Sequence, residues 1–168
     1  GTITIVVTAN DSNGGTVTKS FDLIVANIND APTVVNPIGN QNATEDSLFT
    51  FQFDDDVFAD VDVGDVLVYS ATLSGGSALP DWLEFDPLTR TFSGTPTNSD
   101  VGTITIVVTA NDSNGGTVTE SFDLVIANTN DAPTVVNPIG TQNATEDLPF
   151  SFQFDEDVFA DEDVGDVL

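Results

Sequence analysis

The chain contains a long internal repeat, and this repeat constrains the fold more than any other feature. Residues 1–67 return as residues 102–168 with a period of 101, and 57 of these 67 positions are identical. A period of this length matches one small domain, so each repeat has enough chain to build its own hydrophobic core. The sequence therefore predicts a string of similar domains rather than a solenoid of short repeats.

The period divides the chain into three parts. We expect residues 1–30 to be the C-terminal part of a preceding repeat, carrying its last two strands. Residues 31–131 are then one complete repeat, and residues 132–168 are the N-terminal part of the next. The two junctions, Ala26–Pro32 and Ala127–Pro133, are short and contain proline, which makes them too stiff for a flexible tether. On this interpretation the chain is a window of a longer array.

Acidic residues far outnumber basic ones. There are 28 Asp and Glu residues against two bases, Lys19 and Arg90, which gives a formal net charge of −26 at pH 7. Nucleic acids and anionic membranes are polyanions themselves, so this charge excludes both as partners. It also opposes a compact state unless cations bind. Two explanations remain open: the acids form a solvated surface suited to high salt, or they are grouped as ligands of a divalent cation.

Several residue types are missing, and their absence removes whole classes of chemistry. The chain has no Cys and no His, so it has no disulfide, no thiol ligand and no usual zinc ligand or general base. No apolar run approaches the ~20 residues of a membrane-spanning helix, so we expect no membrane insertion. An enzyme is a poor interpretation, although Asp60 and Asp62 could in principle act as an acid and base pair.

The hydrophobic pattern has a period of two, which is typical of half-buried antiparallel strands. Alternate residues of Thr103–Thr109 are apolar, and Phe49–Phe53 places three Phe on one face. Turn residues separate such runs about every ten residues, and no amphipathic helix is present. This pattern predicts an all-β fold, a Greek-key β-sandwich of cadherin or immunoglobulin type in tandem array. The expected strands of one repeat are 33–37, 48–53, 66–73, 83–86, 90–94, 103–110 and 117–127.

The sandwich topology predicts which acidic loops meet, because consecutive loops alternate between its two ends. We call the end where the chain enters a repeat its upstream end, and the other its downstream end. The residues expected at the upstream end, beside the first junction, are Asn29, Asp30, Asp60, Asp62 and Asp112. Those expected at the downstream end, beside the second junction, are Glu45, Asp100, Asn130 and Asp131. Acids from two repeats and the linker should therefore converge at each junction.

Converging oxygen ligands without His or Cys indicate Ca²⁺, which takes six to eight oxygens. Mg²⁺ fits less well because it retains water and demands octahedral geometry. An EF-hand is excluded by the spacing around Asp60 and Asp62 and by the absence of helices. Taken singly, each Asp-x-Asp is better explained as solvated surface, and only the predicted grouping of the acids favours calcium.

Four stretches of the complete repeat resemble a known family. They are Phe58–Ser70, Leu79–Asp86, Phe92–Pro96 and Thr109–Ser113. In this order and spacing they resemble the dystroglycan-type cadherin-like domain, an immunoglobulin-like module of bacterial surface adhesins. The resemblance implies a β-sandwich that occurs in long tandem arrays of large secreted adhesins.

The broader cadherin pattern implies ligand roles by position. Its linker motif Asp-x-Asn-Asp-Asn is matched in part by Asn27–Ala31 and Asn128–Ala132. The first Asp is replaced by Asn and the last Asn by Ala, so one or two ions per junction are expected rather than three. Its Asp-x-Asp matches Asp60 with Asp62. The resemblance also implies ligand roles for Glu146, Asp161 and Asp163, which are the counterparts of Glu45, Asp60 and Asp62 in the next repeat.

These observations predict a structural role. We expect a spacer or filament segment of a large extracellular tandem-repeat adhesin, at the cell surface or secreted, whose junctions are made rigid by calcium. Its partners would be neighbouring repeats of the same chain, with homophilic lateral contacts in a fibre as a variant. The alternative is a carbohydrate- or ligand-binding module of a secreted protein. That role needs an exposed aromatic platform, for which Trp82 and Tyr69 are the available candidates.

Overall fold

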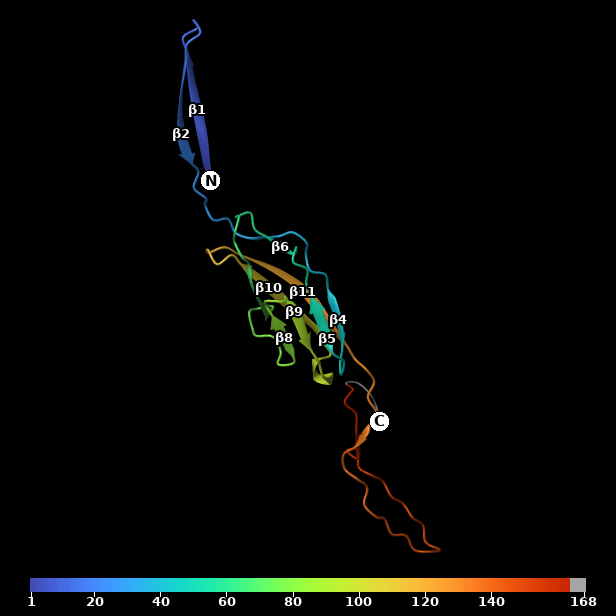
Figure 1. Cartoon of the computed structure of the whole chain (residues 1–168). Helices are drawn as coiled ribbons and strands as arrows, with labels where there is room; N and C mark the ends of the chain where they lie inside the picture. The colour runs from blue at the N-terminus through green and yellow to red at the C-terminus, as the bar shows by residue number, and fades with distance from the viewer. Residues whose placement is uncertain (164–168) are drawn as a thin grey trace.

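Two β-sheets face each other at the centre of the structure, a computed structural model that describes residues 1–163 (Figure 1). The larger sheet has the strand order β4-β11-β10-β7, and the smaller has the order β5-β9-β8. The larger sheet consists of β4 (Gln41–Thr44), β11 (Thr117–Ala127), β10 (Gly102–Asn111) and β7 (Val68–Leu73). The smaller consists of β5 (Phe49–Gln52), β9 (Thr91–Gly94) and β8 (Leu83–Asp86). The predicted all-β sandwich is confirmed.

Short elements complete the molecule. The hairpin β1 (Thr2–Asn10) with β2 (Thr16–Ile24) lies beyond one end of the sandwich (Figure 1). Two-residue strands pair as β3 (Thr33–Val34) with β6 (Phe58–Ala59), and as β12 (Thr134–Val135) with β13 (Phe159–Ala160). The 3₁₀ turn η1 spans Asn98–Asp100. Residues 1–163 contain no helix that is long and apolar enough to cross a membrane.

The core lies between the two sheets, as the period of two requires. On β10, Ile106 and Val108 are fully buried, and on the neighbouring strand β11 of the same sheet Phe122 and Leu124 are buried beside them. Phe92 of β9 is also fully buried and meets Phe122 edge to face at a centroid distance of 5.7 Å. Such aromatic pairs add to the stabilisation that area burial provides.

The structure explains why the Phe92–Pro96 stretch contains a glycine, Gly94. This residue ends β9 opposite Leu83 of β8, and a Cβ at this position would strike the backbone carbonyl of Trp82. Trp82 itself is half-buried and packs against the core. The glycine therefore allows β8 and β9 to approach closely at the point where the only Trp of the chain closes the sandwich.

The structure differs from the sequence-based expectation near the start of the repeat. The expected strand 33–37 stops at Val34, because the N–H groups of Val35 and Asn36 both donate to the Val57 carbonyl and so leave the regular ladder. A strand that the pattern did not predict, β4, follows at Gln41–Thr44 and pairs with β11 in parallel rather than antiparallel fashion. Because its sequence Gln-Asn-Ala-Thr offers a single apolar residue, Ala43, the period of two gives it no signal.

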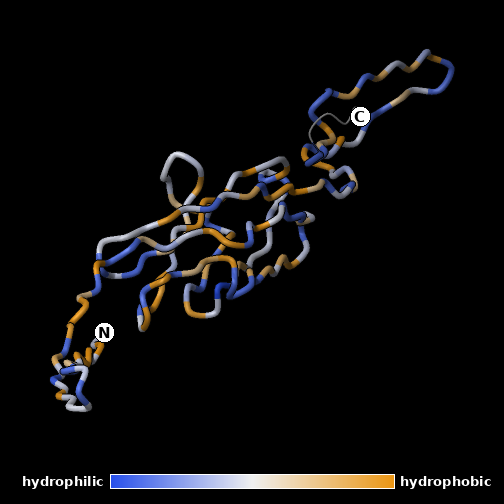
Figure 2. The backbone as a smooth tube through the Cα atoms, turned by 90° about the horizontal axis from the view of Figure 1, so that it is seen from above, coloured by the Kyte–Doolittle hydropathy of each residue, from blue (hydrophilic) through white to orange (hydrophobic). Residues whose placement is uncertain are grey.

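Identical sequences differ in burial between the centre and the ends of the chain. Phe21 is 53% exposed in β2, whereas its counterpart Phe122 in β11 is 2% exposed. Within residues 1–163, β1–β2 and β12–β13 form separate two-stranded sheets. Figure 2 shows orange, hydrophobic segments in the parts of the chain that lie beyond the sandwich at either end. The apolar face of the repeated hairpin is buried only where β4, β7 and the smaller sheet surround it.

Candidate metal centre at the domain junctions

Four acidic side chains are buried in the described part of the chain, and all four belong to the predicted ligand set. Each lies at the start of a connection between strands or between repeats, where backbone N–H groups are free to donate to it. Burial of a carboxylate is unfavourable unless hydrogen bonds or a cation compensate its charge. The four residues and their exposed fractions are Glu45 (1%), Asp62 (9%), Asp112 (2%) and Asp163 (7%).

At the first junction, Asp62 holds the linker with both carboxylate oxygens. Asn27 Nδ2 donates to Asp62 Oδ1 at 2.8 Å, and the Asp30 backbone N–H donates to Asp62 Oδ2 at 2.7 Å. The backbone N–H of Asp62 donates in turn to Asp60 Oδ1 at 2.9 Å. The Asp-x-Asp motif after β6 therefore folds over the linker, as the sandwich topology predicts.

Asp112 forms a second anchor for the same linker. Asn29 Nδ2 donates to Asp112 Oδ2 at 2.9 Å, and this bond is the main reason that the pKa of Asp112 lies below its usual value. The backbone N–H groups of Asn114 and Gly116 lower the pKa further by donating to Asp112 Oδ1, while burial opposes them. A side chain at Gly116 would meet Asp112 and the linker residue Ala31, so this glycine lets the hairpin seat against the linker.

The second junction repeats this geometry 101 residues later. Asn128 Nδ2 donates to Asp163 Oδ1 at 2.9 Å, and the Asp131 backbone N–H donates to Asp163 Oδ2 at 2.8 Å. The Asp163 N–H donates to Asp161 Oδ1 at 3.0 Å. The arrangement is thus a property of the repeat and does not depend on one position in the chain.

Glu45 adds the downstream end of the complete repeat to this second junction. The parallel pairing of β4 with β11 carries it to the start of the linker, where the Glu45 N–H donates to the Ala127 carbonyl at 3.1 Å. Glu45 Oε1 accepts a hydrogen bond of 2.6 Å from the Thr129 N–H. Glu45 Oε2 is buried and has no hydrogen-bond partner.

The carboxylates form two compact groups. Oxygen atoms of Glu45, Asp131 and Asp163 lie within 4.8 Å of one another. A second group with the same spacing consists of Asp60, Asp62 and Asp65. Two oxygens on opposite sides of one Ca²⁺ are about 5 Å apart, so either group can place its oxygens around a single ion of this kind. Asp60 Oδ2, like Glu45 Oε2, is buried without a hydrogen-bond partner.

Three predicted residues have other contacts. Asp100 caps the η1 turn, where its Oδ2 accepts from Thr97 N at 2.9 Å and from Thr97 Oγ1 at 2.8 Å, and it lies outside both carboxylate groups. Asn130 Nδ2 donates to the Asp131 carbonyl at 2.8 Å. Glu146 is exposed and lies outside both carboxylate groups.

The structure also brings in residues that the predicted set omits. Asp65 joins the group of Asp60 and Asp62, and Asn98 Nδ2 donates to Asp163 Oδ1 at 3.3 Å. Asp65 could have been found, because it lies in the same short acidic loop. Asn98 could not have been found from the sequence, because Asp100 is the acidic residue of this segment and is therefore the predicted ligand. The η1 turn, which the sequence did not predict, directs the Asn98 amide toward the junction.

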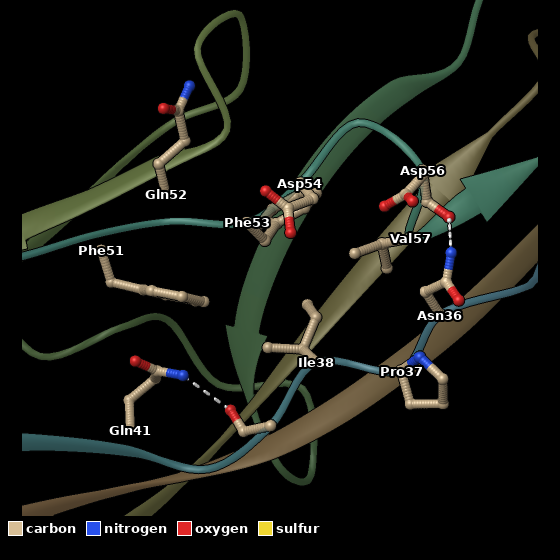
Figure 3. Close-up of a pocket in the computed structure, with 11 residues that line it drawn as sticks. Asn36, Pro37, Ile38, Gln41, Phe51, Gln52, Phe53, Asp54, Asp56 and Val57 are labelled. Atoms are coloured by element: carbon tan, nitrogen blue, oxygen red, sulfur yellow. Dashed lines mark hydrogen bonds between the residues drawn. The ribbon is translucent and has the colours of Figure 1, made fainter.

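A cavity of 180 Å³ lies between the edges of the two sheets (Figure 3). Its amides bond to neighbouring backbone, since Gln41 Nε2 donates to the Gly39 carbonyl and Asn36 Nδ2 to the Asp56 carbonyl. Its aromatic rings, Phe51 and Phe53, form part of the core. This cavity offers no free aromatic face of the kind that the carbohydrate-binding alternative requires.

Comparison with known families and proteins agrees with this fold. Residues 31–127 match the family model described as "Putative Ig domain". A "Serine-rich adhesin for platelets" of Staphylococcus aureus is 30% identical over 125 residues, which cover 72% of this chain and 5% of that protein. The homologue of strain MSSA476 is 29% identical over 147 residues, covering 85% and 6%. The chain thus spans about one twentieth of the length of these relatives.

Solved structures show more distant likenesses. An endo-fucoidan hydrolase of glycoside hydrolase family 107 aligns with a TM-score of 0.47 and 22% identity, over 76% of this chain and 19% of that one. The ectodomain of human desmocollin-1 aligns with a TM-score of 0.40 and 16% identity, over 80% of this chain and 28% of that one.

Proposed function

This chain belongs to the Ig domain family, and we propose that it is a structural segment of a large extracellular adhesin built from tandem repeats. In this role residues 31–131 are one complete repeat, while residues 1–30 and 132–168 belong to its neighbours. The similarity to staphylococcal adhesins supports this role, as does the internal period of 101 residues. A spacer only has to be long and stiff, so near-identical copies suit it and no catalytic site is required.

Calcium at each junction is the second part of the proposal. The observation that carries it is Glu45, whose Oε2 is buried without a hydrogen-bond partner and which has a carboxylate oxygen within 4.8 Å of oxygens of two further acids. An unpaired buried charge is strongly unfavourable, and a divalent cation compensates it directly. The chain has only two basic residues, and Arg90 Nε donates to the Phe53 carbonyl. Oxygen ligands alone favour Ca²⁺ over transition metals.

Such an ion would make the array rigid because its ligands come from both sides of the linker. Glu45 belongs to one repeat, Asp131 to the linker and Asp163 to the next repeat. The linker is already bonded on both sides, by Thr129 N–H to Glu45 and by Asp131 N–H to Asp163. Without the cation, the three carboxylates repel one another and favour separation of the repeats.

Small-angle scattering on three whole repeats tests this proposal. We expect calcium to lengthen the particle and sharpen its distance distribution, and a chelator to reverse both changes. Sodium chloride at matched ionic strength screens charge without supplying a ligand, so it should reproduce only a small part of the effect. A profile that is the same with calcium and with chelator would contradict calcium stiffening and would favour the solvated-surface or ligand-binding roles.

A further inference from the structure

The loop that joins β10 to β11 contains an asparagine followed by two glycines. Asn114 and Gly115 are exposed, and Gly115 has a φ of +114°, a conformation that glycine adopts readily. Gly115 has no side chain to hinder the approach of the Asn114 carboxamide to its backbone nitrogen, whose N–H also lies near the Asp112 carboxylate. The same sequence, Asn13 followed by Gly14 with a φ of +101°, occurs in the loop between β1 and β2.

We propose that Asn114 is a site of spontaneous deamidation, and that its contact with Asp65 slows the reaction. The Gly115 nitrogen loses its proton and attacks Asn114 Cγ, which forms a C–N bond and expels the side-chain nitrogen as ammonia. Water then opens the cyclic imide at either carbonyl, giving aspartate or isoaspartate. The net change converts an amide and water into a carboxylate and ammonium, with no oxidant, metal or enzyme.

The position of Asn114 gives this reaction a structural consequence. Asn114 Nδ2 donates to Asp65 Oδ2 at 2.9 Å, and Asp65 is one of the three acids grouped after β6. Deamidation replaces the donor with a carboxylate and places a fourth acid beside that group. This consequence rests on the proposed function: where the group binds calcium, aspartate at position 114 adds a ligand, and without calcium it adds repulsion.

Asn13 has the same local sequence as Asn114 but forms a different hydrogen bond, so a comparison of the two residues tests the role of Asp65. Asn13 Nδ2 donates at 3.3 Å to the carbonyl of Asp11, within the same loop. The Asn114 amide instead bonds to Asp65, a residue 49 positions away in another loop of the same repeat. The Asn114 carboxamide must leave Asp65 before Gly115 can attack, so Asn13 should react several-fold faster than Asn114.

Peptide mapping of the whole chain by mass spectrometry tests the proposal. After incubation in mildly alkaline buffer without calcium, we expect aspartate and isoaspartate at both Asn13 and Asn114. Asn42, which precedes Ala43, is the internal reference for slow reaction. Asn114→Gln should abolish the product at its own site, because glutamine requires a larger ring. Asp65→Ala removes the acceptor of the Asn114 amide, so it should accelerate reaction at Asn114 several-fold and leave Asn13 unchanged.

The two claims of this inference, that Asn114 deamidates readily and that Asp65 slows the reaction, can be contradicted separately. Reaction at Asn114 no faster than at Asn42 would contradict the first claim. Equal rates at Asn13 and Asn114, together with no effect of Asp65→Ala, would contradict the protective role of the Asp65 contact. Calorimetric titration of calcium into Asn114→Asp tests the consequence: tighter binding than wild type is expected, and unchanged affinity overturns the ligand role. Failure of the wild type to bind calcium would refute the calcium part of the proposed function and leave the chemistry of Asn114 intact.

Discussion

Glu45 combines two properties that conflict in a folded protein, because it is acidic and 1% exposed while one of its oxygens lacks a partner. A bound calcium ion would compensate this buried charge. Replacing Glu45 by a neutral residue should therefore stabilise the fold without calcium and weaken calcium binding when the ion is present. The sequence predicts Glu45 at the junction from the alternation of loops between the two ends of a sandwich, but the parallel strand β4 that carries it there was not predicted.

The first prediction concerns Glu45→Gln. Without calcium, the variant should be more stable than wild type, because it removes an uncompensated buried charge. With calcium, it should bind the ion roughly tenfold more weakly, about 1.4 kcal/mol. Thermal melting with and without calcium, together with calorimetric titration, measures both changes. Glu84→Gln makes the same change on the exposed face of β8 and is the matched control. Equal calcium affinity in both variants would contradict the assignment of Glu45 as a calcium ligand.

The second prediction concerns acid. The pKa of Asp112 is lowered, chiefly by the Asn29 amide, so its ionised form is favoured in the folded state. Its contribution to stability is therefore present above the unfolded pKa of about 3.9 and is lost as pH falls through the lower, folded pKa. Asp112→Asn should melt earlier than wild type near neutral pH and should lose less stability on acidification below about pH 4. Asp81→Asn controls for the change in net charge, and parallel pH profiles for Asp112→Asn and wild type would contradict the assignment.

At the scale of single elements, a hydrophobic period of two correctly predicted those strands that bury one face. The strands 83–86 and 117–127 match the expectation, because their alternate residues pack into the core. The pattern failed for β4 and β6, which are short and owe their pairing to neighbours distant in sequence. The acidic loops were placed at the correct junctions because loop position follows from sandwich topology, whereas Asn98 depends on the η1 turn and left no pattern.

Gly94 provides the element-scale prediction. A methyl group there would overlap the Trp82 carbonyl, so Gly94→Ala must separate β8 from β9 or distort the strand end. We expect a loss of about 3 kcal/mol in the free energy of unfolding, the upper range for overpacked sites. Urea unfolding measures the loss. Gly39→Ala is the control, because a Cβ at Gly39 meets no atom within 4 Å. Equal stability of the two variants would show that the strands can part without penalty.

At the scale of the molecule, the proposed domain limits predict independent folding. Residues 31–131 alone should give one cooperative thermal transition, because both sheets and the whole core lie within these limits. Residues 1–30 alone should show little β-structure by circular dichroism, since an isolated hairpin is marginally stable in water. A fragment 31–131 that fails to fold, or a stable hairpin from residues 1–30, would require different limits.

The parallel pairing of β4 with β11 has a mechanical consequence. β4 lies near the start of the repeat and β11 at its end, and the two are joined from Gln41–Leu124 to Thr44–Ala127. A pull on the two ends of the repeat draws these strands past each other along their length. The inter-strand hydrogen bonds are then loaded together in shear, instead of opening one by one as in a hairpin pulled from its open end. A repeat tethered by these two strands should resist stretching until the whole ladder breaks at once, which single-molecule force measurement would record as one high, sharp rupture per domain.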